Sequence, residues 1–193
     1  MKIRVPHLLV PALVLFPALA EAHPGHGPAT GFWPGAAHPI SGLDHIVAMM
    51  AVGIWAAQLG GRYLWAVPLS FISLMAVGGA LGDAGVPVPY VEQAIIMSVL
   101  ILGVMIAAAT RLPMWGSCAL VGLFALCHGH AHGAEMPLSA SGLAYGVGFI
   151  VSTTGLHLLG IGLGVALQKL ARVQLVRFAG VGIFTCGIYL AFI

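Results

Sequence analysis

Long apolar runs separated by short polar connections make up most of the chain. Six runs of about 20 residues are each long enough to cross roughly 30 Å of hydrocarbon. They do not show the alternation of polar and apolar positions that barrel strands have, so we predict an all-α fold, a polytopic membrane helix bundle with six transmembrane helices. The runs lie approximately at 41–59, 63–82, 89–109, 113–132, 142–168 and 173–193.

The first 22 residues have the pattern of a cleavable signal peptide. Lys2 and Arg4 precede an apolar stretch that ends in small residues. Cleavage after Ala22 would leave residues 23–193 as a single six-helix transmembrane domain; cleavage after Ala20 and an uncleaved anchor are the alternatives. The mature chain would begin at His23, whose side chain and free amine could bind a metal together with His26, or could belong to a flexible polar leader.

Composition narrows the class of protein. The chain is 60% hydrophobic and only 6% charged, whereas about a quarter of the residues of a soluble domain are charged. The net charge of +2 comes from scattered side chains and does not indicate a nucleic-acid partner. The lipid bilayer is the expected surrounding, and no phosphate-binding glycine loop for ATP is present.

Basic side chains fall on one side of the predicted membrane topology. If the mature N-terminus is outside, the connections on the cytoplasmic side hold the basic residues and the other connections hold no Lys or Arg. This asymmetry agrees with the signal peptide and predicts a multi-pass protein of the bacterial inner membrane with a periplasmic N-terminus. The residues concerned are Arg62, Arg111, Lys169 and Arg172, with Arg177 nearby.

Glycine is abundant in the predicted spans, notably in the fifth, and in the second at Gly78 and Gly79. Small residues in lipid-embedded helices usually allow two backbones to approach closely. A passage lined by glycine is the alternative interpretation.

Two polar motifs stand out against the apolar background. The first span begins HPISGLDHIVAMM and the fourth ends HGHAHGAE. If the first helix begins near Ser41 as its N-cap, His45 and Met49 share one face with Asp44 beside them. In the fourth span His128 and His132 share a face and His130 points elsewhere.

Topology predicts that these motifs meet at the outer face, since the first span starts there, the fourth ends there and the third starts there. Imidazole with carboxylate suits divalent Ni, Co, Zn or Cu, and such groups are costly in hydrocarbon unless they are paired or bind ions. Met49 is expected to pack in the core, and Glu92 to be a ligand, a partner of one, or an acid that only contacts water. The candidate metal ligands are His38, Asp44, His45, Glu92, His128, His132 and Glu135.

His157 extends the candidate set into the membrane. It lies about 20 Å below the outer surface if the fifth span is helical, at 1.5 Å per residue. It could be a hydrogen-bond partner between helices or a transit site for an ion.

The two motifs, with a signal peptide and six spans, resemble the HupE/UreJ family of membrane proteins tied to nickel or cobalt supply for hydrogenase and urease. The resemblance implies uptake of nickel or cobalt, and cytoplasmic nickel chaperones of hydrogenase or urease maturation as partners. It carries Asp44, His45, His132 and Glu135 over as functional positions, followed by His38, His128 and Glu92.

The predicted function is therefore facilitated uptake of a divalent metal ion through an outer site. The ion, Ni²⁺ or Co²⁺, would be bound transiently as cargo; no catalytic cofactor and no catalytic residue are predicted. The alternative from another class is an intramembrane zinc-dependent hydrolase, in which His and Asp hold zinc and activate water. A scaffold that binds metal without moving it is the third interpretation.

Overall fold

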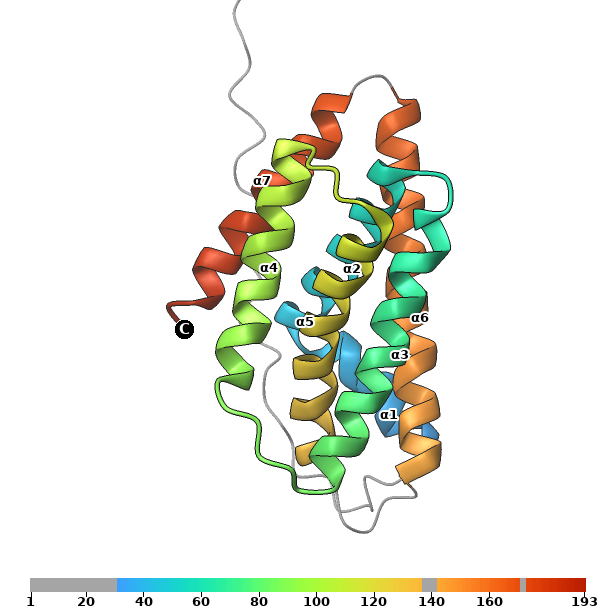
Figure 1. Ribbon diagram of the computed structural model, residues 1–193, viewed down its shortest axis with the longest axis vertical. Coiled ribbons are helices and arrows are strands. Elements are labelled where there is room, and N and C mark those ends of the chain that lie inside the picture. Colours follow the sequence, from blue (N-terminus) through green and yellow to red (C-terminus); the bar gives the residue numbers. More distant parts are fainter. Residues whose placement is uncertain (1–30, 137–141, 171–172) are drawn as a thin grey trace, which may run out of the picture.

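Seven α-helices and no strand make up the part of the chain that the structure describes, which is residues 31–136, 142–170 and 173–193 of a computed structural model (Figure 1). The predicted signal peptide, His23, His26 and Arg172 lie outside these residues. The helices are α1 (Phe32–Ser41), α2 (Leu43–Leu59), α3 (Tyr63–Asp83), α4 (Val91–Ala108), α5 (Met114–Ala134), α6 (Gly142–Lys169) and α7 (Val173–Leu190).

Helices α2 to α7 coincide with the six predicted runs to within a few residues. Within the described residues, α3, α4 and α6 are long and apolar enough to cross a membrane, and α1 with α2 would add a fourth span if this bent pair counts as one. The chain is thus an all-helical, multi-pass membrane protein. Helix α5 is less apolar because its last two turns hold three histidines, and α7 is shorter.

Helix α1 was not predicted, and it changes where the first span begins. It meets α2 at an angle of 84°, and the bend lies at Gly42, whose backbone is extended. The prediction that Ser41 caps α2 was wrong: α2 begins at Leu43 after Gly42, without a side-chain cap. The Ser41 hydroxyl donates to the carbonyl of His38, 2.7 Å away, so Ser41 closes the last turn of α1.

Glycines bring α5 into backbone contact with α3. A Cβ atom added at Gly129 would lie 1.9 Å from the Met75 carbonyl oxygen, and one at Gly133 would lie 2.0 Å from that of Gly79. Gly78 and Gly82 on α3 face α5 in the same way. These positions confirm close packing for this helix pair, with the spacing of four residues that is common between membrane helices.

Glycines in α6 divide into two sets. Gly148, Gly160 and Gly164 would each bring an added Cβ into contact with α1 or α2. Gly146, Gly155 and Gly162 have no neighbouring atom within 4 Å of that position. Only the first set supports the packing interpretation.

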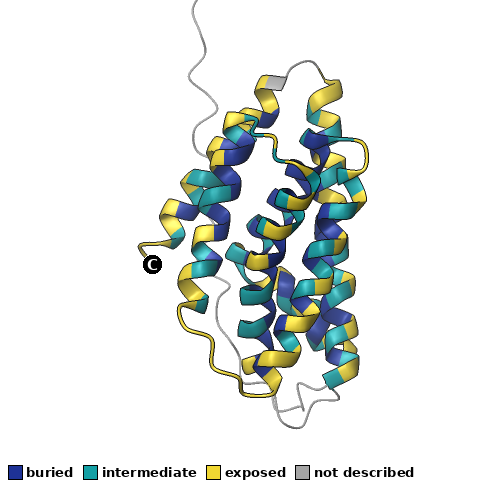
Figure 2. Ribbon diagram, viewed as in Figure 1, coloured by how far each residue is buried: buried dark blue, intermediate teal, exposed yellow. Residues whose placement is uncertain are grey.

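The bundle has a buried interior (Figure 2). Many of its exposed side chains are large and hydrophobic. Exposed tryptophans lie near the start of α3 and of α5, at Trp65 and Trp115, while Trp33 and Tyr90 are exposed toward the opposite end. Amphipathic aromatic rings of this kind are enriched where a membrane meets water. Helix α3, with 21 residues, spans about 31 Å between these two levels, close to the thickness of a bilayer core.

Charged residues also separate along the bundle axis. Because successive helices run in alternating directions, α3 and α5 finish where α4 and α6 start (Figure 1). We call this the acidic end, because Asp83, Glu92 and Glu135 lie there. The basic end is the opposite one, defined by Arg62, Arg111 and Lys169. The two polar motifs, HPISGLDHIVAMM and HGHAHGAE, both lie toward the acidic end.

Candidate metal centre

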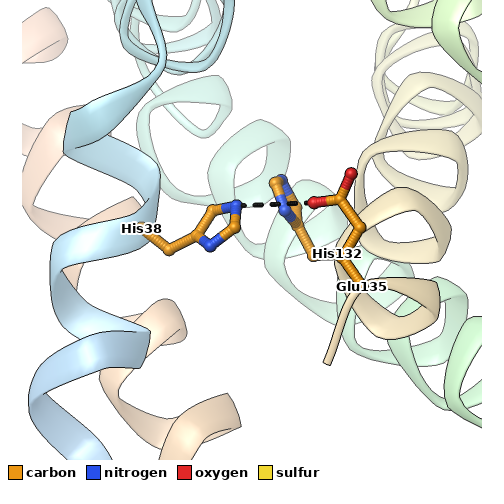
Figure 3. A group of neighbouring side chains, drawn as sticks. All are labelled: His38, His132 and Glu135. Atoms are coloured by element: carbon orange, nitrogen blue, oxygen red, sulfur yellow. Dashed lines mark ion pairs between the residues drawn. The ribbon is translucent and has the colours of Figure 1, made fainter. Parts of the chain in front are cut away.

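Three donor groups come together at the acidic end. His38 from α1, His132 from α5 and Glu135 just after α5 each offer a ligand atom within 4.8 Å of the other two (Figure 3). His38 Nε2 lies 3.9 Å from Glu135 Oε2. Two atoms bonded to one ion at about 2.1 Å each are at most about 4.2 Å apart, so this pair is already within the required separation.

The bend after α1 carries His38 to this position. The Ser152 hydroxyl of α6 donates to the Ala36 carbonyl at 2.5 Å, which holds α1 against α6. The Tyr145 hydroxyl lies 2.8 Å from His38 Nδ1. When His38 Nδ1 donates this hydrogen bond, its Nε2 keeps a free lone pair facing Glu135 and His132.

Helix α5 carries histidines on one face and glycines on the neighbouring face. His128 and His132 are one turn apart and both buried, while the adjacent Gly129 and Gly133 lie against α3. His130 points away, as predicted, and its Nε2 lies 2.6 Å from the Val86 carbonyl. Close glycine packing thus fixes the rotation of α5 that turns the two histidines inward.

His45 joins the group from α2 with a defined tautomer. Its Nδ1 lies 2.8 Å from Asp44 Oδ1, and since a carboxylate only accepts, Nδ1 carries the proton. The His45 ring centroid is 4.4 Å from that of His132 and 5.4 Å from that of His128. Asp44 therefore contacts His45 directly and is placed to orient this candidate ligand.

The bend also confines the Asp44–His45 pair. A Cβ atom added at Gly42 would lie 2.6 Å from Asp44 Oδ1 and 2.8 Å from His45 Nδ1. The pair occupies the space that any side chain at this position would need.

Several imidazole nitrogens of this group have no hydrogen-bond partner among the described residues. They are His45 Nε2, His128 Nε2 and both nitrogens of His132, and all are buried. Buried polar atoms are satisfied in the great majority of cases, and an unsatisfied one costs about 1–3 kcal/mol. Each neutral imidazole keeps one lone pair, and neighbouring lone pairs without a hydrogen-bond donor suit a cation. Imidazole with one carboxylate suits nickel, cobalt, zinc or copper.

Not every predicted ligand lies in this group. Glu92 is exposed at the start of α4, and no hydrogen bond or ion pair joins it to another described residue. Met49 is fully buried in the core, as expected for packing. His157 lies deeper in α6, away from the carboxylates.

Sequence reasoning missed two residues beside the donors. Tyr145 bonds His38, and the Phe149 ring lies 4.5 Å from that of His132, centroid to centroid. Both come from the first eight residues of α6. A tyrosine hydroxyl in an otherwise apolar run was the available signal for Tyr145.

A cleft of about 470 Å³ lies next to the centre, between α3, α5 and α6. Its lining is mostly apolar and includes no histidine, although it borders the site at Tyr145 and Phe149. It is therefore adjacent to the donor group and does not contain it.

Residues 11–190 match the family model described as HupE / UreJ protein. The chain is also 46% identical over 167 residues to Protein HupE of Rhizobium leguminosarum bv. viciae, which covers 84% of this chain and 87% of that protein. No solved structure matches the chain. The family match includes every described donor.

Proposed function

Because the chain belongs to the HupE / UreJ family, a family of transporters associated with nickel and cobalt, we propose that it carries Ni²⁺ or Co²⁺ into the cell by facilitated diffusion. The observation that supports this most is the convergence of His38, His132 and Glu135 at one end of a membrane bundle. His45, oriented by Asp44, adds a fourth donor beside them.

The proposed topology has six spans, α2 to α7, with α1 as a short helix on the outer side. The acidic end faces the periplasm and the basic end the cytoplasm, in accord with the positive-inside rule. A signal peptide cleaved after Ala22 would leave the mature N-terminus outside, and the inner membrane is the proposed location.

The exposed fraction of the donor side chains falls from the water-facing donor to the innermost one. The Glu135 side chain is 64% exposed and that of His38 33%, while His132 is buried. An incoming hydrated ion would meet the carboxylate first and exchange its water for imidazoles as it moves inward. A site with few protein ligands also holds the ion loosely enough to release it, which transport requires.

The membrane potential supplies enough free energy for accumulation. Moving two positive charges through about 100 mV, negative inside, releases about 4.6 kcal/mol. This corresponds to a concentration ratio above about a thousandfold. Cytoplasmic nickel chaperones of hydrogenase or urease maturation, which we propose as partners, would maintain inward flow by binding the delivered ion.

The test is ion flux with the purified protein in proteoliposomes across a panel of metals. We expect radiolabelled nickel or cobalt to enter faster than zinc or copper, and faster than into protein-free vesicles. Metal binding without flux would instead support the scaffold interpretation. The zinc-hydrolase alternative is set aside because the family is one of transporters.

A further inference from the structure

His157 lies in the middle of α6 with 1% of its surface exposed. Neither of its ring nitrogens has a hydrogen-bond partner among the described residues. One nitrogen of a neutral imidazole must carry a proton, so a buried donor and a buried acceptor are both left unsatisfied. The hydrogen-bond role that the sequence left open is therefore not what the structure shows.

A soft donor lies one helical turn from His157. Thr153 precedes it by one turn on α6 and is 3.8 Å from Met75 Sδ on α3, to which its hydroxyl donates. Phe71, one turn before Met75, has its ring 5.0 Å from that of His157 in an edge arrangement. Helices α3 and α6 thus bury a thioether beside Thr153 and an imidazole beside Phe71, one helical turn apart.

His128 lies between His45, one of the outer donors, and Phe71, which contacts His157. Its Nδ1 donates to the Phe124 carbonyl at 3.0 Å, so the unpartnered Nε2 carries a lone pair. The His128 ring lies 5.4 Å from that of His45 on one side and 5.7 Å from that of Phe71 on the other. Phe71 therefore contacts both His128 and His157.

We propose that His157 and Met75, supplied through His128, form a second, inner metal station about 20 Å from the start of α6. This inference rests on the proposed transport function and deepens it. The station contains nitrogen and sulfur donors, which suit borderline and soft transition-metal ions and disfavour Mg²⁺ and Ca²⁺. It holds no carboxylate, so the ion keeps its full charge there and is bound weakly enough to leave toward the basic end.

A cysteine placed at the station reports directly whether metal reaches it. A cysteine thiolate binds Co²⁺ and gives a near-ultraviolet sulfur-to-metal charge-transfer band. We expect this band, above the wild-type background of three native cysteines, in purified His157→Cys titrated with Co²⁺. Leu158→Cys is the matched control, because Leu158 is the next residue but is 62% exposed on the outer surface. No band in His157→Cys, or an equal band in both variants, would overturn the station.

A second pair of variants covers the case in which His157→Cys does not fold. Met75→Leu conserves volume, and Met97→Leu makes the same change at an exposed position of α4. We expect Met75→Leu to lower nickel flux several-fold with unchanged affinity of the outer donors, and Met97→Leu to behave as wild type. Equal flux in the two variants would contradict the inner station. Absence of flux in the wild type would contradict the transport function instead, and the cobalt band, measured at equilibrium, would still report on the station.

Discussion

The protonation pattern of single histidines decides what this centre can bind. His45 and His128 each use Nδ1 as a donor, to Asp44 and to a main-chain carbonyl respectively, so that Nε2 of each carries a lone pair. Carboxylate and carbonyl partners of this kind set the orientation and basicity of metal-bound imidazoles. The groups that accept from these two Nδ1 atoms therefore determine which imidazole nitrogen is free to bind a metal.

Asp44→Asn tests whether the Asp44 carboxylate sets the tautomer of His45. The amide has nearly the shape of the carboxylate but no charge, and it can turn its NH₂ group toward His45, which would move the imidazole proton to Nε2. We expect nickel affinity to fall about 10- to 100-fold, the usual effect of losing such a partner, as measured by calorimetric titration. Asp83→Asn, the same change at an exposed acid of the acidic end, should have little effect. Unchanged affinity in Asp44→Asn would remove Asp44 from the mechanism.

Tyr145→Phe removes only the hydroxyl that contacts His38 Nδ1. With a metal on Nε2, His38 Nδ1 carries the proton and donates to the Tyr145 oxygen. Without this acceptor we expect the nickel concentration for half-maximal flux to rise about tenfold. Tyr90→Phe is the control because that hydroxyl is exposed at the same end. A similar response from both variants would show that Tyr145 does not position His38.

At the scale of elements, the apolar runs alone predicted α2 to α7, because crossing hydrocarbon requires long stretches with satisfied backbone and few charges. Helix α1 was missed because it is only 10 residues long and includes Pro39, features that indicate a loop when read from sequence. Its packing on α6 makes it helical, and this packing brings His38 into the donor group. The family resemblance ranked His38 below His45 and His132, whereas the structure brings His38 together with His132 and Glu135.

The glycine contact between α3 and α5 gives a prediction about stability. In Gly133→Ala the new methyl group would overlap the Gly79 carbonyl, so the helices must separate. We expect a loss of about 1–3 kcal/mol in unfolding free energy, seen as a lower melting temperature in detergent, together with weaker nickel binding at the neighbouring His132. Gly155→Ala, where the added Cβ has no atom within 4 Å, should be neutral or slightly stabilising. Equal melting temperatures would argue against close α3–α5 packing.

At the scale of the whole molecule, alternating helix direction predicted which motifs meet. The start of α2 and the end of α5 lie at the same end, so His45 and His132 could be expected to approach from sequence alone. Glu92 lies at that end without joining the donor group. Helix direction predicts the end of the bundle at which a residue lies, but not its lateral position or the direction of its side chain. Tyr145, Phe149 and the layer around His157 depend on helix rotation, which the nearly uniform apolarity of α6 does not encode.

Orientation in the membrane can be tested with two cysteine variants in a background without native cysteines. Asp83 and Arg111 are both exposed, at the acidic and basic ends respectively. We expect a membrane-impermeant maleimide to label Asp83→Cys on intact cells, and Arg111→Cys only after permeabilisation, because the basic end should face the cytoplasm. The reverse pattern would invert the proposed direction of the site.

Gly42 shows how far the demands of this centre reach beyond its donor atoms. It offers no ligand and lies in a bend, where sequence drift is ordinarily tolerated. Even the smallest side chain there would enter the space held by Asp44 and His45. A genetic screen for mutants that take up too little of the metal should therefore recover substitutions at codon 42, in proteins whose candidate ligands are all unchanged.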